Sequence, residues 1–250
     1  RDTYVLDDRG VSSLQTTLNY GNFDSATLTN NIKTFVIDKR SKTSCSSLNR
    51  EKSQYRLFFD DGYGLYMTIV NGKLIGSMPV LFPTPAYCAF EGEISDGNEI
   101  TMFGSASGGY VYQLDRGASF DGESIDAFLT FNWNAIGSPR VMKRFRKASL
   151  ETTGNAFANV AFGYQLGYGT EEIYQPNNVS YDAQFQGLPR WDSFTWDQFV
   201  WDGRTLMPTD CEMTGTANNV QITITASTNY IQSFTINSII LHYSFRRGMR

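Results

Sequence analysis

Histidine and cysteine are the residues from which a catalytic or metal site would most readily be built, and both are scarce. His242 is the only histidine, and it lies in an apolar stretch near the end of the sequence. The cysteines, Cys45, Cys88 and Cys211, are far apart and form no C-x-x-C pair. A zinc site needs three or four close ligands, and a serine or cysteine nucleophile needs a basic partner. We therefore expect no metal site and a structural role for His242.

Carboxylates are more plentiful, but turn chemistry explains them. Aspartate is favoured in turns because its side chain accepts hydrogen bonds from the nearby backbone. The aspartates concerned are Asp60, Asp61, Asp96, Asp115 and Asp121. No phosphate-binding loop, dinucleotide fingerprint or nucleophile elbow is present. The sequence therefore predicts a chain that is not an enzyme and carries no cofactor, with a hydrolase of cell-wall or capsule glycans as a weaker alternative.

Positive charge is concentrated in one short segment. This segment contains Arg140, Lys143, Arg144, Arg146 and Lys147, and Arg246, Arg247 and Arg250 add a basic tail. Three interpretations stay open. The charges protect a solvated edge strand from pairing with other edges, contact an acidic neighbouring subunit, or contact DNA phosphates.

A tryptophan-aspartate pair recurs every five residues at Trp191, Trp196 and Trp201. This spacing fits neither one face of a strand nor one stripe of a helix, so we expect a bent segment. Exposed tryptophans would stack on sugar rings or anchor a protein partner. Buried ones would cover one end of a hydrophobic core.

Composition limits the possible partners. The 250 residues have a formal net charge of −4 and a pI of about 5.1, which argues against a general polyanion binder. Three dispersed cysteines favour folding in a reducing cytoplasm. No apolar stretch is long enough to span a bilayer, and no secretory signal is present. Because the sequence begins with Arg1, we expect a processed or partial portion of a longer protein.

Turn-forming dipeptides divide the first half of the chain into short strands. Four Asp-Gly or Asn-Gly pairs, beginning at Asp61, Asn71, Asp96 and Asp121, are typical of tight hairpins because both residues accept positive φ angles. The runs between them predict strands at 55–59, 65–70, 73–77, 86–93, 99–103, 110–114 and 124–131. A hairpin at 4–14, one short helix near 24–38 and a polar loop at 41–53 precede these strands. A faint similarity between 57–66 and 101–112 has the period of a propeller blade.

Longer, two-faced strands follow Ser138. Apolar residues alternate with polar or small ones over 158–168 and 220–226, as expected for half-buried strands. In the last strand the apolar alternation shifts by one residue near Ser238, which predicts either a β-bulge or a switch between sheets. Long strands of this kind are typical of a β-sandwich.

Several of these segments resemble proteins of the tail tubular protein B, or tail nozzle, family of short-tailed bacteriophages. The resemblance is carried by residues 54–62, 109–117, 119–123, 137–147 and 240–247, together with the tryptophan-aspartate run. It touches nearly the whole chain in the same order. It implies a propeller-containing subunit of a usually sixfold ring below the portal and adaptor, which forms the DNA exit channel and supports fibres or a needle.

We therefore expect an all-β chain with two domains. Residues 1–137 are predicted to form a blade-like β-meander, a partial propeller, and residues 138–250 an antiparallel β-sandwich. The resemblance implies a structural subunit of the virion tail, assembled in the host bacterial cytoplasm. Its partners would be other copies of itself, neighbouring adaptor and fibre proteins, and the phage DNA that passes through. The alternative is a carbohydrate-binding module of a receptor-binding tail protein.

Overall fold

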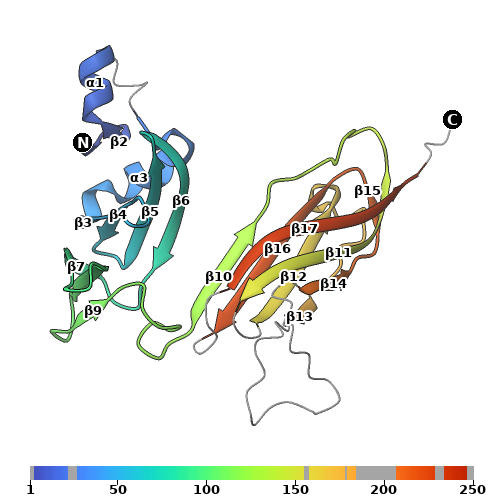
Figure 1. Cartoon of the computed structure of the whole chain (residues 1–250). Coiled ribbons are helices and arrows are strands. Elements are labelled where there is room, and N and C mark those ends of the chain that lie inside the picture. Colours follow the sequence, from blue (N-terminus) through green and yellow to red (C-terminus); the bar gives the residue numbers. More distant parts are fainter. Residues whose placement is uncertain are drawn as a thin grey trace, which may run out of the picture. The chain divides into compact units, whose positions relative to one another are not determined.

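The chain is all-β, as the sequence predicts, and its strands pair antiparallel. A computed structural model describes residues 3–21, 27–154, 158–177, 179–183, 207–228 and 234–246 (Figure 1). The chain divides into two compact units, Arg1–Arg116 and Gly117–Arg250.

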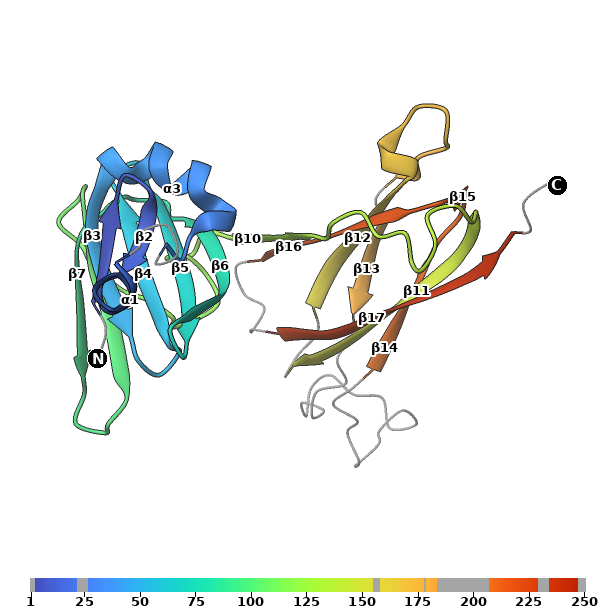
Figure 2. The same cartoon turned by 90° about the horizontal axis from the view of Figure 1, so that it is seen from above.

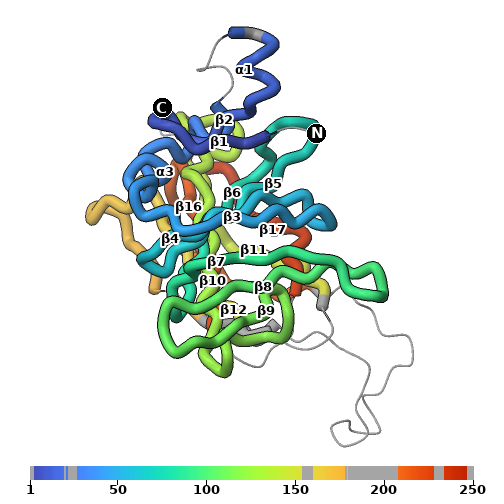
Figure 3. The backbone as a smooth tube through the Cα atoms, turned by 90° about the vertical axis from the view of Figure 1, so that its left-hand side faces the viewer, coloured from blue at the N-terminus to red at the C-terminus, as the bar shows by residue number. Residues whose placement is uncertain are grey.

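The first unit combines a small hairpin, two short helices and two further sheets. Its hairpin and helices are β1 (Tyr4–Asp7), β2 (Gly10–Ser13), α1 (Leu14–Tyr20) and α3 (Lys33–Lys39), with 3₁₀ turns at Asn30–Ile32 and Arg40–Lys42 flanking α3. Its other strands are β3 (Thr43–Asn49), β4 (Gln54–Phe59), β5 (Tyr63–Val70), β6 (Lys73–Leu81), β7 (Ala86–Glu93), β8 (Glu99–Ser105) and β9 (Val111–Gln113). The sheet orders are β3-β4-β5-β6 and β7-β8-β9 (Figure 3). In the described residues these sheets do not close into a propeller.

Most strands of the predicted meander are confirmed, because their turns are encoded locally. Asn71 and Gly72 have φ angles of 52° and 74°, which is the double positive φ that a tight hairpin between β5 and β6 requires. The predicted polar loop at 41–53 is wrong, since β3 occupies most of it. In β3, Ser47 and Asn49 are buried although they are polar, so the usual apolar signal of a strand is missing there.

The predicted helix near 24–38 is only partly correct. Helix α3 begins at Lys33, and Thr27 instead forms an isolated bridge with Ser12 of β2. Helix α1 was not predicted. It begins where the Ser13 side chain accepts a hydrogen bond from the Thr16 amide, and it ends at Gly21, whose φ of 63° permits a left-handed cap. Asp24, where the predicted helix would begin, lies outside the described residues.

The sheet β3-β4-β5-β6 is covered on both faces. One face packs beneath α3 and the β1-β2 hairpin, and its core residues are Val11, Val36, Leu57, Phe59, Leu65 and Met67 (Figure 2). The other face carries an aromatic cluster formed by Phe58, Tyr66, Phe82 and Phe103. Phe103 belongs to β8, so this cluster joins the two sheets of the first unit.

The second unit is an antiparallel β-sandwich, as predicted. Its strands are β10 (Ile125–Thr130), β11 (Lys143–Gly154), β12 (Ala158–Leu166), β13 (Val179–Ala183), β14 (Met207–Glu212), β15 (Thr216–Ala217), β16 (Val220–Thr228) and β17 (Phe234–Phe245). One layer has the order β10-β16-β12-β13. In the other layer β11 lies between β17 and the pair β14 and β15 (Figure 2). The core between the layers includes Phe145, Leu150, Val160, Phe162, Val220 and Ile222.

The bulge predicted near Ser238 is confirmed. Ser238 pairs with Glu151 and Ile236 pairs with Thr152, so Asn237 is the extra residue of β17. The insertion lets Phe234 and Ile236 face the same core as Ile239 and Leu241 although the two pairs differ in phase.

The boundary between the two compact units lies between residues 116 and 117, earlier in the sequence than the expected 137/138. Strand β10 follows the meander in sequence but pairs with β16, and Ile125 lies opposite Thr228. Pairing over this sequence distance places residues 117–137 in the second unit. Local turn chemistry carries no information about such a long-range partner.

Candidate interaction surfaces

Four of the five residues of the basic segment lie at the start of β11, which is an inner strand, and Arg140 lies in the turn before it. Along β11, Lys143 is opposite Phe245 of β17 on one side and Ala217 of β15 on the other. The interpretation of the charges as protection of an open edge strand is therefore wrong. What the charges do depends on where each side chain points.

Lys143 points into the sandwich and is unavailable to any partner. Its side chain has no exposed surface. The Nζ atom donates to the carbonyl oxygens of Ser138, Val141 and Asn218 at 2.7, 2.9 and 3.2 Å. Three acceptors match the three donors of an ammonium group. Lys143 therefore fastens the 138–141 turn and the 218 loop to β11. It is not a residue that contacts a partner.

Lys147 is held by a neighbour on β14. Its Nζ atom lies 2.8 Å from Oδ2 of Asp210, and the Ser149 hydroxyl donates to Oδ1 of the same carboxylate at 2.5 Å. The hydrogen bonds from Lys147 and Ser149 hold the pKa of Asp210 below its usual value. One cation of the basic segment is thus compensated within the chain.

His242 joins this polar group but does not complete a catalytic triad. Its Nε2 atom lies 3.4 Å from the Ser149 hydroxyl, which itself donates to Asp210. In a Ser-His-Asp triad the imidazole lies between carboxylate and hydroxyl and removes the serine proton. Here the serine lies in the middle and its proton is already engaged. This order of partners builds a polar outer face on β11, β14 and β17 and does not activate a nucleophile.

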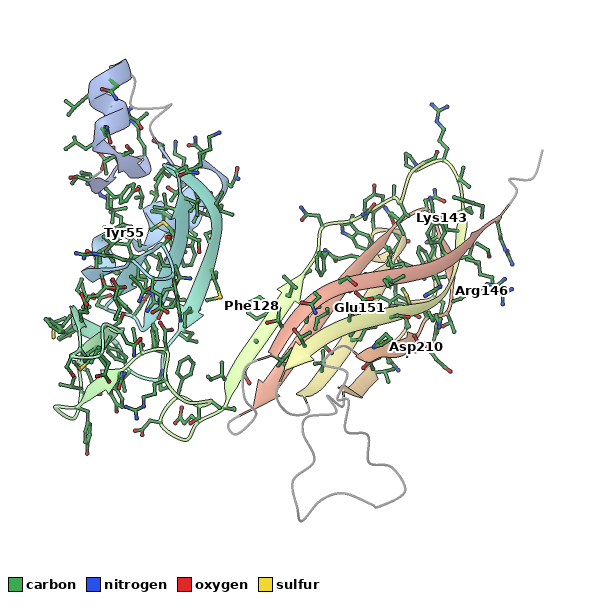
Figure 4. All side chains as sticks on the ribbon, in the orientation of Figure 1. Tyr55, Phe128, Lys143, Arg146, Glu151 and Asp210 are labelled. Atoms are coloured by element: carbon green, nitrogen blue, oxygen red, sulfur yellow. The ribbon has the colours of Figure 1, made fainter. Side chains whose placement is uncertain are left out.

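The remaining basic residues form what we call the arginine patch: Arg140, Arg144, Arg146 and Arg246. All four are exposed, and within the described residues none has an ion pair. The backbone amide of Arg246 donates to the Met142 carbonyl at 2.8 Å, which ties the start of the basic tail to the segment. Arg146 is the extra residue of a β-bulge between Phe145 and Lys147, and its side chain projects away from β11 (Figure 4).

A second surface lies along β10, at the edge of its sheet. In the described residues β10 pairs with β16 alone. Phe128, labelled in Figure 4, is 77% exposed, and Leu129 is 46% exposed. Neighbouring residues of a strand point to opposite faces of its sheet. Both faces of an apolar edge strand are therefore uncovered.

The unpaired backbone groups of β10 follow from its register. The Phe131 amide donates to the Ile222 carbonyl at 2.9 Å, so Phe131 and Ile222 form a hydrogen-bonded pair. Such pairs alternate along an antiparallel ladder. Asp126, Phe128 and Thr130 therefore direct their amides and carbonyls toward the open side. This side, with the exposed apolar side chains, is the β10 edge.

Sequence reasoning missed the charged group inside the first unit. Arg56 has no exposed side-chain surface, and its guanidinium lies 4.3 Å from the Tyr66 ring centroid. It donates from Nη2 to Asp115 at 2.6 Å and to Gln54 at 2.8 Å. The available signal was its position, because Arg56 lies two residues before Phe58 and so shares the face of β4 that carries the aromatic cluster.

The cysteines are free thiols. Cys211 is buried in the sandwich, and burial raises the pKa of its thiol to about 11. Burial likewise raises the pKa of Cys45. Neither environment favours the thiolate that nucleophilic chemistry requires.

Trp191, Trp196 and Trp201 lie outside the described residues, so the structure does not place the predicted glycan or partner contact. In the part of the chain that the structure describes, no cluster of metal-ligating side chains occurs. No described helix is long and apolar enough to cross a membrane. In comparisons with known proteins, the chain matches no family model and no curated sequence.

Proposed function

We propose that the chain is a structural subunit of a bacteriophage tail, of the nozzle or tail-tube type. In this proposal copies assemble in the host cytoplasm into a ring that surrounds the DNA exit channel and supports fibres or a needle. The segments that resemble the tail nozzle family support this assignment, and so does the all-β architecture that the family implies. Ring size and tail neighbours follow from the resemblance alone.

The observation that carries the proposal is the β10 edge. Covering one Phe and one Leu side chain contributes roughly 3–6 kcal/mol in total, at about 1.5–3 kcal/mol each. An edge strand that leaves such residues uncovered invites pairing with another chain, and soluble monomers usually block it with charge or proline. The edge offers backbone and apolar contacts together, which is what a lateral subunit contact requires.

The arginine patch supplies a second contact of different chemistry. Exposed arginines without partners suit an acidic surface, and the chain has a net charge of −4 to supply one. Apolar pairing would provide affinity, while charge would fix the register between subunits. DNA passing through a ring would contact the arginine patch only if the patch faced the channel.

Virion association tests the assignment directly. Antibodies against the chain should label the tails of purified particles in electron micrographs, and the chain should appear in their protein profile. A chain that is absent from purified particles would contradict the proposal whatever its behaviour in solution.

Assembly through β10 is tested with the purified chain. Phe128→Lys should shift the sedimentation profile from assemblies toward single subunits. Tyr174→Lys is a matched control, because Tyr174 is 70% exposed in the same unit but lies outside any strand. Equal assembly of both variants and the parent chain would exclude the β10 edge as the contact.

A further inference from the structure

Three buried polar atoms of the first unit have no hydrogen-bond partner among the described residues. They are Oγ of Ser47, Nη1 of Arg56 and Oε1 of Glu91. Buried polar side-chain atoms are almost always paired with protein or with ordered water, because leaving one unpaired costs about 1–3 kcal/mol. Three such atoms in one unit therefore need a common explanation.

The three residues come from neighbouring strands and converge. Ser47 of β3 is the register partner of Arg56 of β4, so their side chains lie side by side on one face. Glu91 belongs to β7, which packs against β3. Its carboxylate accepts a hydrogen bond from the Leu48 amide, next to Ser47. Burial raises the pKa of this carboxyl, and the charge of Arg56 acts to lower it.

The neighbouring pair Asn49 and Thr101 fixes this arrangement. Nδ2 of Asn49 donates to Oγ1 of Thr101 at 3.5 Å, and Thr101 is the register partner of Glu91. Asn49 and Ser47 share a face of β3. The hydrogen bond therefore links β3 to β8 beside the three unpaired atoms.

The chemistry of the three atoms restricts what can join them. Arg56 is a donor only, and an ionised Glu91 is an acceptor only, so the ligand must accept from one and donate to the other. Its charge must be neutral, because Arg56 is already paired with Asp115 at 2.6 Å. Its size must be small, because each of the three atoms has less than 1 Å² of accessible surface.

We propose that one ordered water molecule accepts from Arg56 and donates to Glu91, with Ser47 as its third partner. Buried waters typically make about three hydrogen bonds to otherwise unpaired groups, as this one does. The water links the β3-β4-β5-β6 sheet to the β7-β8-β9 sheet, beside the aromatic cluster. It is part of the fold of the first unit and does not depend on assembly.

A crystal structure of the chain at about 2 Å resolution tests the site, because waters with three partners are well ordered at that resolution. A solvent peak within hydrogen-bonding distance of all three side chains is expected. A direct hydrogen bond from Nη1 of Arg56 to Oε1 of Glu91, with no solvent peak, would overturn the proposal.

Solution measurements provide a second test. Ser47→Ala and Glu91→Ala should each reduce the folding equilibrium constant, by about tenfold if one net hydrogen bond is lost. Because both residues bind the same water, the double variant should lose less than the product of the two factors. Ser46→Ala, on the exposed face of β3, is the control. Fully multiplicative effects would show that no shared ligand connects Ser47 and Glu91.

Discussion

Arg56 donates a 2.6 Å hydrogen bond to Asp115 from a position with no exposed surface, whereas 31% of the Asp115 side chain is exposed. The pair therefore joins a charge in the interior of the first unit to a counter-charge at its rim. Asp115 takes a φ of 60° to reach this position, and Lys52 contacts the same carboxylate at 3.1 Å. A buried guanidinium tolerates this environment only while it is paired.

Asp115→Asn should lower the free energy of unfolding by about 2 kcal/mol. Breaking a fully buried pair costs about 3–5 kcal/mol, and the partial exposure of Asp115 reduces that cost. Denaturant unfolding of the purified chain measures the change. Asp96→Asn, in an exposed Asp-Gly turn, is the matched control and should have little effect. Equal losses in the two variants would mean that the Arg56 pair does not stabilise the fold.

The same pair should make stability depend on acid pH. Burial alone raises the pKa of Asp115, but the hydrogen bond and charge of Arg56 outweigh it and hold the pKa below 3.8. A depressed pKa contributes stability above the unfolded value that is lost as pH falls through the folded value. Parent chain and Asp115→Asn should therefore converge in unfolding free energy as the pH falls below about 4. A constant difference down to the acid transition would contradict this assignment.

The contribution of Glu91 to stability should depend on pH in the opposite direction. Burial is the largest cause that raises its pKa above 4.5, and the charge of Glu99 adds to it, while the Leu48 amide and the nearby arginines oppose the shift. A raised pKa contributes stability that is present below the unfolded value and lost as pH rises through the folded value. The stability of the parent chain relative to Glu91→Gln should therefore fall as the pH rises past 4.5. Denaturant unfolding at a series of pH values measures it, with Glu93→Gln as an exposed control.

Local chemistry explains which parts of the fold were predictable. The Asn71-Gly72 turn and the alternation of Val160, Phe162 and Tyr164 are encoded by adjacent residues, and both are confirmed. The pairing of β10 with β16 is not encoded by adjacent residues. The partner strand lies about a hundred residues away, and any exposed apolar strand of similar length would pair with β10 equally well.

The candidate contact residues show the same limit. The basic segment reads as one uniform cluster, yet Lys143 is buried, Lys147 is paired and only the arginines face outward. Alternation along a strand predicts that neighbours differ, but the bulge at Arg146 changes the phase within the segment. Sequence alone therefore identified the region and could not separate its structural lysine from its exposed arginines.

Lys143 and Lys147 should respond differently to the same substitution. Lys143→Met leaves three backbone carbonyls without their donor and should lower the free energy of unfolding by about 2–3 kcal/mol. Lys147→Met removes an exposed ion pair with Asp210 and should have a much smaller effect. Unfolding by urea compares the two directly. A larger loss for Lys147 would show that the outer polar group, and not the buried ammonium, stabilises this end of the sandwich.

The arginine patch should govern assembly through charge. Arg144→Gln with Arg146→Gln should reduce the assembled fraction in sedimentation, and added salt should have the same effect on the parent chain because exposed charges are screened within about 10 Å at 0.1 M salt. Arg116→Gln, an exposed arginine of the first unit, is the control. Stability should not change, since neither Arg144 nor Arg146 has an ion pair among the described residues.

Binding of labelled duplex DNA, measured on the same variants, separates the two roles of the patch. If the patch contacts a neighbouring subunit, assembly falls in the double variant and DNA affinity stays negligible throughout. If it contacts DNA, affinity falls steeply with salt, and each lost phosphate contact reduces the logarithmic slope by about 0.9. Unchanged assembly together with such a slope would assign the patch to the DNA in the channel and leave the β10 edge as the subunit contact.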